Sequence, residues 1–199
     1  MLFDWLKKKY KSKLPWHWVA PICLLVFVPS MNHSAYAVNA TEYEVKAAYL
    51  YHFTQFIDWP DKAFASPKDG FNICIMGKNP FGTALIPILK RNYKGHPFNL
   101  QFPENANEAR NCHLLYIASS DSKADTAILA KLKNAPVLTV SSQPGFVERG
   151  GGIGFLLADN HVRFSINRSA SKHTGIISSA KLLELAVRIV DDRSSEEQK

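Results

Sequence analysis

The pattern of apolar and polar positions is clearest near the carboxyl end of the chain. Residues 162–167, VRFSIN, alternate one apolar with one polar side chain, which is typical of a β-strand with one buried face. An apolar run at 153–158 precedes them. Asp159-Asn160, between the two runs, is a pair that tolerates the positive backbone dihedrals of a tight turn. The pattern therefore predicts a β-hairpin.

The glycines just before this hairpin, in GGGIGF at 150–155, could belong to a phosphate-binding loop or to a tight turn. A phosphate-binding glycine loop opens a helix, because the free N–H groups of the helix face the phosphate. Here a strand pattern follows instead, and the chain has no Gly-Lys-Ser or Gly-Lys-Thr. A tight turn or a close approach of backbone is therefore the favoured interpretation.

A helical pattern follows Thr41, which can cap a helix that ends at Asp58-Trp59-Pro60. Its apolar residues recur at steps of three and four, which predicts one buried face. The residues of this face are Val45, Ala48, Tyr49, His52, Phe53 and Phe56.

Strand and helix patterns alternate through the rest of the chain. Strands are predicted at 71–76, 97–102, 114–118 and 136–140, and helices at 79–89 and 125–133. Ser178 or Ser179 can cap a last helix, whose inward-facing residues are predicted to be Leu182, Leu185, Ala186 and Ile189. The order predicts an α/β fold of three layers, with a mostly parallel sheet, helices on both faces and a C-terminal antiparallel hairpin at one edge.

The first 37 residues have the order of a secretory signal peptide. Five lysines between residues 7 and 13 precede an apolar run from Val19 to Val28 and then Ala35-Tyr36-Ala37, a cleavage site of the A-x-A type. An uncleaved membrane anchor is the alternative, but the run is far shorter than the ~20 apolar residues of a spanning helix. We expect export and cleavage after Ala37.

Cleavage of the signal peptide lowers the net charge of the chain and so changes which classes of binding partner are expected. Loss of residues 1–37 lowers the formal net charge from +7 to +3 and leaves no basic stripe, which argues against nucleic-acid binding. Residues 38–190 are long enough for a single domain with a full core, and the charged, serine-rich tail at 191–199 is expected to be disordered.

Two cysteines, Cys74 and Cys112, are left after Cys23 departs with the signal peptide. Two cysteines in an exported chain most often form a disulfide, and two separately buried thiols are the alternative. No histidine or further cysteine stands at the spacing of a metal site, so no metal or other cofactor is expected.

Catalytic motifs are missing from the sequence. It has no G-x-S-x-G, no H-E-x-x-H and no C-x-x-C. His52 lies on the predicted apolar helix face, and His113 could activate Cys112 only if that sulfur were free. The other histidines stand at predicted turns or element ends: His96, His161 and His173. We expect a protein that is not an enzyme.

Four blocks of sequence occur in one order along the mature chain. They are EYEVKAAYLYHFTQFIDWP at 42–60, FNICIMGKNPFG at 71–82, CHLLYIASS at 112–120, and GGGIGFLLADNHVRFSIN followed by SSAKLLELAVRIV. With these blocks the chain resembles the YfiR family of periplasmic proteins over essentially the whole mature region. Some members are similar in having two disulfides, whereas this chain has only the Cys74 and Cys112 pair, which leaves redox control by a second bridge open.

The resemblance implies a non-enzymatic repressor in the periplasm. Such a protein binds the periplasmic sensor portion of an inner-membrane diguanylate cyclase and thereby lowers cyclic-di-GMP signalling and biofilm formation. A homodimer is possible. The expected partner surface is the outward face of the hairpin, with Phe155, Arg163, Ser165 and Asn167, while Val162, Phe164 and Ile166 face the core. An ordinary solvated sheet face is the plain alternative.

Two other classes of protein remain open. One is a periplasmic small-molecule binding protein, with a ligand cleft at the carboxyl ends of the parallel strands, near 77–82 and 119–121. The other is a hydrolase of an unrecognised kind. A compound retained by the purified protein would favour the first, and turnover of generic esters or phosphates the second.

Overall fold

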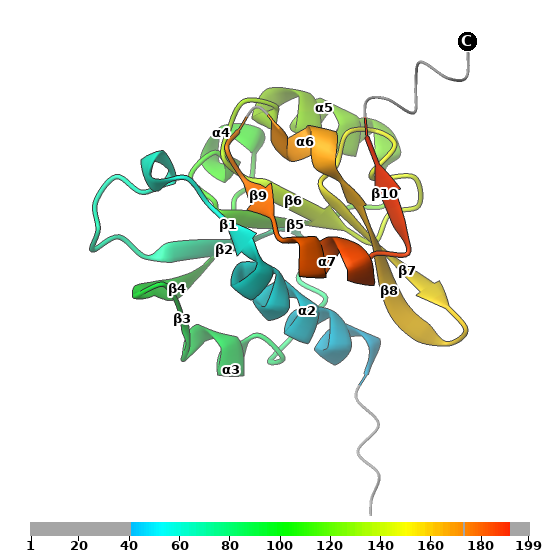
Figure 1. Cartoon of the computed structure of the whole chain (residues 1–199), viewed down its shortest axis with the longest axis horizontal. Helices are drawn as coiled ribbons and strands as arrows, with labels where there is room; N and C mark the ends of the chain where they lie inside the picture. Colours follow the sequence, from blue (N-terminus) through cyan, green and yellow to red (C-terminus); the bar gives the residue numbers. More distant parts are fainter. Residues whose placement is uncertain (1–40, 173, 192–199) are drawn as a thin grey trace, which may run out of the picture. The chain divides into compact units, whose positions relative to one another are not determined.

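The computed structural model describes residues 41–172 and 174–191. An eight-stranded sheet crosses the middle of this region, with helices on both faces (Figure 1). The predicted signal peptide at 1–37, Cys23, His173 and the tail from residue 192 lie outside the described residues. Within the described residues, no helix is long and apolar enough to cross a membrane.

The strands of the large sheet follow the order β10-β8-β7-β6-β5-β2-β4-β3. Five neighbouring pairs are parallel, and the β7–β8 and β3–β4 pairs are antiparallel. The bounds are β2 (Phe71–Gly77), β3 (Asn92–Tyr93), β4 (His96–Gln101), β5 (Leu114–Ala118), β6 (Leu138–Ser141), β7 (Ile153–Ala158), β8 (His161–Asn167) and β10 (Arg188–Val190). The predicted fold class is confirmed, and β10 adds one short parallel strand outside the hairpin.

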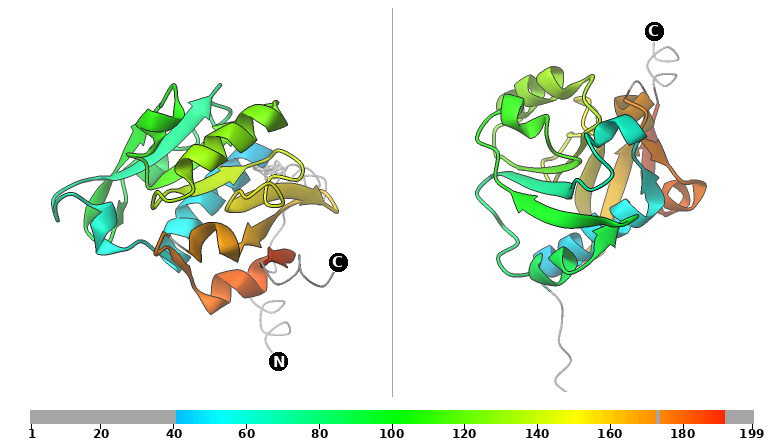
Figure 2. Two further views of the ribbon diagram at one scale, coloured as in Figure 1. Left: turned by 90° about the horizontal axis from the view of Figure 1, so that it is seen from above. Right: turned by 90° about the vertical axis from the view of Figure 1, so that its left-hand side faces the viewer.

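Helices cover both faces of this sheet (Figure 2). One face packs against α2, α3 and α7 around a large aromatic and aliphatic core, and the other packs against α4 and α5 around a smaller core. The bounds are α2 (Glu42–Phe56), α3 (Ile86–Leu89), α4 (Ala106–Ala109), α5 (Ser122–Leu132), α6 (Arg168–Lys172) and α7 (Ala180–Leu185). A turn of 3₁₀ helix covers Asp61–Ala63, and β1 (Ile57–Asp58) pairs with β9 (Ile177–Ser178).

Helix α2 begins at the predicted cap. The Thr41 hydroxyl accepts the Glu44 N–H, and the Glu44 carboxylate accepts the Thr41 N–H, which completes a capping box. The buried face is rotated from the predicted one: Ala48 and His52 are exposed, and the buried residues are Lys46, Ala47, Leu50, Phe53 and Thr54. The helix ends after Phe56 because Ile57 turns into the extended pair with β9.

The predicted hairpin is present. Phe155 lies opposite Phe164, and the turn residues Asp159 and Asn160 have φ angles of +49° and +62°. The glycines before the hairpin allow a close approach: a Cβ on Gly151 would lie 2.2 Å from the Phe146 ring. The turn interpretation of GGGIGF is therefore confirmed.

The last predicted helix is wrong in its length. Ser179 caps α7 by accepting the Leu182 N–H, but the helix ends at Leu185, and Ala186 is extended. The chain then runs parallel to β8 as β10. Only Leu182 of the predicted inward residues is buried, whereas Leu185 and Ile189 are exposed. The helix predicted at 79–89 is likewise shortened to α3, at its carboxyl end.

Candidate functional site

The four residues expected on the outward face of the hairpin do not lie together at the surface. Arg163 is exposed, but Phe155, Ser165 and Asn167 keep only 4%, 8% and 7% of their surface. Residues opposite each other in an antiparallel pair lie on the same face, so Phe155 faces the core with Phe164. The sequence-based placement of Phe155, Ser165 and Asn167 at the surface is wrong.

The loop between β6 and β7 covers the other face of the hairpin, which carries Ser165 and Asn167, and so buries these two residues. Asn167 Nδ2 donates to the Val147 carbonyl at 2.8 Å, and its Oδ1 accepts the Ala170 N–H at 3.1 Å. A Cβ on Gly154 would lie 3.3 Å from Val147 Cγ1, so the same loop also covers β7. The Asn167 side chain thus satisfies backbone groups inside the protein.

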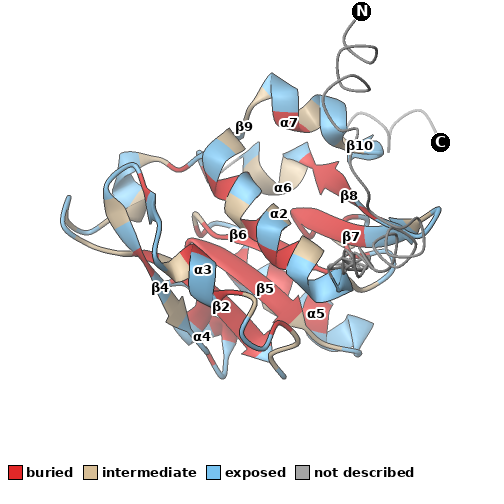
Figure 3. Cartoon of the chain, turned by 90° about the horizontal axis from the view of Figure 1, so that it is seen from below, coloured by how far each residue is buried: buried red, intermediate tan, exposed pale blue. Residues whose placement is uncertain are grey.

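A different stretch exposes large apolar side chains. Leu185, Val187 and Ile189 are 58%, 53% and 42% exposed, and together we name them the C-terminal apolar surface. They lie at the end of α7 and along β10, and the exposed colour of α7 contrasts with the buried central strands (Figure 3). Exposed apolar clusters on a folded domain are typical of binding surfaces.

Strand β10 is also a sheet edge. It pairs with β8 on one side, through Arg188–Ser165, Ile189–Ile166 and Val190–Asn167, and has no second neighbour in the described part of the chain. An edge strand offers unpaired N–H and C=O groups to another chain. The apolar surface and the open strand edge are therefore adjacent.

Charged pairs border this edge. Arg188 lies 2.5 Å from Glu148, and Arg168 lies 3.5 Å from Asp191. A cavity of about 450 Å³ opens beside the edge, between residues of α6, β9 and α7, and exposed Ile177 is part of its lining. An apolar centre with a polar border is the usual composition of a protein interface.

The carboxyl ends of β2, β5 and β6 form a second candidate site. A cleft of about 340 Å³ lies there, in the region that the sequence suggested for a ligand. Its lining residues are Tyr43, Lys78, Pro80, Tyr116, Ile117, Ala118, Ser119, Ser120, Ser141, Ser142 and Gln143. The sequence indicated the segments after β2 and β5 but missed Tyr43 and the segment after β6.

Beneath this cleft lies a buried lysine that sequence reasoning missed. Lys46, in the first turns of α2, is 3% exposed; it pairs with Glu42 and donates to Ser142 Oγ at 2.7 Å. Ser142 Oγ in turn lies 2.9 Å from the Tyr116 hydroxyl. Burial raises the pKa of Tyr116 to about 12, so its hydroxyl keeps its proton at pH 7.

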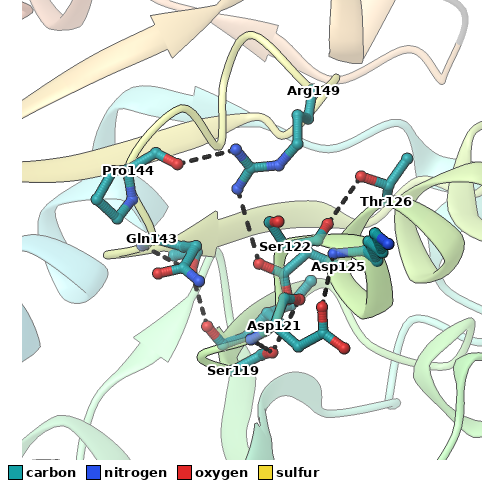
Figure 4. A network of polar contacts seen from close by, with 11 residues as sticks. Ser119, Asp121, Ser122, Asp125, Thr126, Gln143, Pro144 and Arg149 are labelled. Atoms are coloured by element: carbon teal, nitrogen blue, oxygen red, sulfur yellow. Dashed lines mark hydrogen bonds and ion pairs between the residues drawn. The ribbon is translucent and has the colours of Figure 1, made fainter.

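A buried charge pair lies on the α5 side of the same sheet end (Figure 4). Asp125 is fully buried, and its carboxylate lies 3.9 Å from Arg149 Nη2. Neither carboxylate oxygen has a hydrogen-bond partner among the described residues. Burial raises the pKa of the Asp125 carboxyl, and the positive charge of Arg149 acts in the opposite direction. Arg149 also donates to the Pro144 carbonyl at 2.8 Å, so the pair anchors the loop after β6.

The cysteines and the histidine beside them have structural surroundings. Cys74 and Cys112 form the predicted disulfide, with their Cα atoms 6.0 Å apart. His113 Nδ1 accepts the Asn72 N–H at 2.9 Å, so the ring proton is on Nε2 and is donated to the Ala63 carbonyl at 3.1 Å. Burial lowers the pKa of His113 to about 4, so the ring is neutral at pH 7.

Other histidines and acidic residues form no cluster in the residues described. His52 is exposed, and His96 and His161 contact backbone carbonyls. No group of three or more His, Cys, Asp or Glu side chains in 41–172 and 174–191 is arranged to hold a metal ion.

Comparison with known proteins places the chain in a family. A family model described as YfiR/HmsC-like matches residues 43–187. This chain belongs to the YfiR/HmsC-like family. YfiR-like proteins are periplasmic and regulatory rather than catalytic, and they act on a partner protein.

Further matches add little to the YfiR-like assignment. No curated protein matches the chain. Eight chains of solved structures match, among them a conserved domain protein from Vibrio cholerae O1 biovar El Tor with 13% sequence identity and a TM-score of 0.47. That match covers 76% of this chain and 61% of the Vibrio chain.

Proposed function

We propose that this YfiR-like chain is a periplasmic repressor of an inner-membrane diguanylate cyclase. It binds the periplasmic sensor portion of the cyclase, and bound cyclase makes less cyclic-di-GMP, which reduces biofilm formation. The observation that supports this most is the family match over residues 43–187. Export by a signal peptide cleaved after Ala37, with residues 38–190 as the working domain, is part of the proposal.

Repression of this kind needs no chemistry in the repressor. A protein that binds one conformation of a receptor more tightly than another shifts the receptor toward that conformation. The shift is limited by the difference between the two binding free energies. A surface that fits only the inactive sensor is therefore sufficient.

The C-terminal apolar surface and the open edge of β10 are the binding site we propose. Leu185, Val187 and Ile189 supply apolar contact area, and the strand edge supplies backbone hydrogen-bonding groups. Arg163 and Arg188 are both exposed and lie on the opposite face of the sheet from Ile189, so in this proposal they contact the partner from that other face. Phe155, Ser165 and Asn167 are left out because they are buried.

Direct binding tests this function. Purified mature protein, from residue 38, is titrated into the purified periplasmic portion of the cyclase, and complex formation is measured by calorimetry. We expect a saturable complex, with binding lost in a Leu185→Glu, Ile189→Glu variant that keeps the wild-type melting temperature. Light scattering of the protein alone shows whether the same edge forms a homodimer, which would compete with the complex. No binding by folded wild-type protein would refute the proposal for that cyclase.

A further inference from the structure

The cleft at the carboxyl ends of β2, β5 and β6 lies where the chain reverses its direction across the sheet. From β2 the chain passes to β4 on one side, and it returns over β2 to β5 on the other side. The segment after β2 packs on the α2 face, and the segment after β5 enters α5 on the opposite face. Connections that diverge in this way leave a crevice at the strand ends, which is the common ligand position in open α/β sheets.

The backbone at this point is shaped to keep the crevice open. Gly77 and Ala118 are the last register pair of β2 and β5. Gly77 has a φ of +94°, and a Cβ there would lie 2.7 Å from the Ala118 carbonyl oxygen. The chain can therefore leave β2 sharply at Gly77, and this turn places Lys78 in the wall of the cleft.

Among the polar groups beneath the cleft, one hydroxyl proton is left without a hydrogen-bond acceptor. Lys46 can only donate, and it donates to Ser142 Oγ. The two hydroxyls of Ser142 and Tyr116 hold two protons, and the hydrogen bond between them uses one. Whichever hydroxyl donates to the other, one O–H remains on a side chain that lines the cleft. This O–H needs an acceptor.

Other lining hydroxyls are already satisfied. Ser141 donates to the Ile117 carbonyl and accepts the Gln143 N–H, and Ser119 makes the same two kinds of bond with Asp121. Lys78 is exposed, and no described residue forms an ion pair with it. The groups left for a ligand are thus an ammonium, a hydroxyl donor and the side chains of Ser120 and Gln143. They favour an anion.

Two further features indicate what kind of anion fits. The Tyr43 ring forms one wall, packs edge-on against Phe81, and lies beneath the Lys46 ammonium at 4.9 Å, so it is held in place. The loop carrying Ser142 and Gln143 is fixed by the Arg149 bond to Pro144 and by buried Asp125. A rigid aromatic wall beside an anion-binding floor suits a ligand with both a charged and an apolar part.

We infer that this cleft binds a small organic anion, a carboxylate or a phosphate ester, that carries an apolar or ring group. Lys78 and the Tyr116–Ser142 hydroxyl pair bind the charged end, and Tyr43 packs against the apolar end. The site shares no residue with the C-terminal apolar surface. The inference therefore does not depend on the proposed repression, and each can be tested without the other.

The test is a titration of the mature protein, labelled with ¹⁵N, with benzoate, phenyl phosphate and phenol, followed by amide chemical shifts. We expect saturable shifts near residues 78, 119–120 and 142–143 with at least one of the two anions in the millimolar range. Benzoate alone would assign the carboxylate class, and phenyl phosphate alone the phosphate class. Equal binding of neutral phenol would contradict recognition of charge. The absence of saturable shifts with either anion would overturn the inference.

Variants identify the groups responsible. Lys78→Met should weaken anion binding about tenfold or more, because a charge-assisted hydrogen bond is lost. Tyr116→Phe should weaken it less while leaving phenol binding unchanged. Lys90→Met removes an exposed lysine that does not line the cleft, and it should bind like the wild type. Equal weakening by Lys78→Met and Lys90→Met would show a general charge effect and no site.

Discussion

Ile189 of β10 lies directly opposite Ile166 of β8, yet Ile166 is 2% exposed and Ile189 is 42% exposed. Opposite residues of a parallel pair lie on the same face of the sheet, so the difference comes from what covers each strand. Ile166 belongs to the core cluster packed under α2, whereas β10 is the outermost strand of the sheet and none of its residues is part of that cluster. One face of the sheet is thus core at β8 and open surface at β10.

Ile189→Glu should therefore weaken binding to the cyclase sensor without unfolding the protein. A charged side chain in an apolar interface loses contact area and has no partner, which costs on the order of 2 kcal/mol or more at a central position. The melting temperature should change little, because Ile189 is exposed. Ile166→Ala is the matched comparison: it should lower the free energy of unfolding by about 2–5 kcal/mol. Unchanged binding by Ile189→Glu would remove β10 from the proposed interface.

Arg163→Glu and Phe164→Ala test in the same way which face of β8 is buried and which is exposed. Arg163 is exposed and Phe164 is buried against Phe53 and Tyr49, so the two neighbours should behave oppositely. Phe164→Ala should cost about 3–5 kcal/mol of stability. Arg163→Glu should leave stability nearly unchanged and weaken partner binding by at most a few kcal/mol, mainly by slowing association. Urea unfolding and binding kinetics measure the two effects; a stable Phe164→Ala variant would contradict the described core.

Loss of the disulfide should destabilise the fold strongly. The bridge closes 38 residues between Cys74 and Cys112, and a loop of that length is worth about 4 kcal/mol in the chain-entropy account. A double Cys→Ser variant should lower the urea midpoint accordingly. Reductant should destabilise the wild type by a similar amount and leave the double variant unaffected. Free-thiol labelling of unfolded, unreduced protein should find neither Cys74 nor Cys112; labelling of both would contradict the bridge.

Acid should destabilise the protein through His113. Its pKa is lowered to about 4 in the folded state from an ordinary value near 6.5, so the unfolded chain binds more protons between these pH values. The stabilisation is fully present above pH 6.5 and is lost as the pH falls toward 4, by up to about 3 kcal/mol. Protonation of Nδ1 would also break its bond with the Asn72 N–H.

Urea unfolding at pH 7 and at pH 4.5 measures this effect. His113→Asn should be less stable at pH 7 but should lose less stability on acidification than the wild type. His52→Gln, which removes an exposed histidine, should follow the wild-type pH dependence. An equal pH dependence in wild type and His113→Asn would show that other groups are responsible.

Local patterns were sufficient for much of the fold. Alternation predicted β8, and an apolar run predicted β7. The Asp159-Asn160 turn predicted their connection, and Thr41 predicted the start of α2. These features depend on residues near each other in sequence. The pairing of the two cysteines also followed from their number and the expected compartment.

Tertiary contacts decided what the patterns could not. The polar residues Ser165 and Asn167 alternate as if exposed, but a loop 20 residues away in sequence covers Asn167. Leu185 and Ile189 fit a helical period, yet the chain beyond Leu185 gains backbone hydrogen bonds along β8 instead. Burial of Lys46 depends on Ser142, 96 residues away, and no local pattern records it.

The amount of cyclic-di-GMP in cells tests the central claim most directly. It is measured in a strain that expresses the protein and its cyclase, in the strain lacking this gene, and in that strain complemented with wild type or with Ile189→Glu. The account predicts a rise on deletion, a return to the starting level with wild type, and no return with Ile189→Glu at equal periplasmic abundance. A level that does not change when the gene is deleted would contradict repression, and full restoration by Ile189→Glu would contradict the proposed surface.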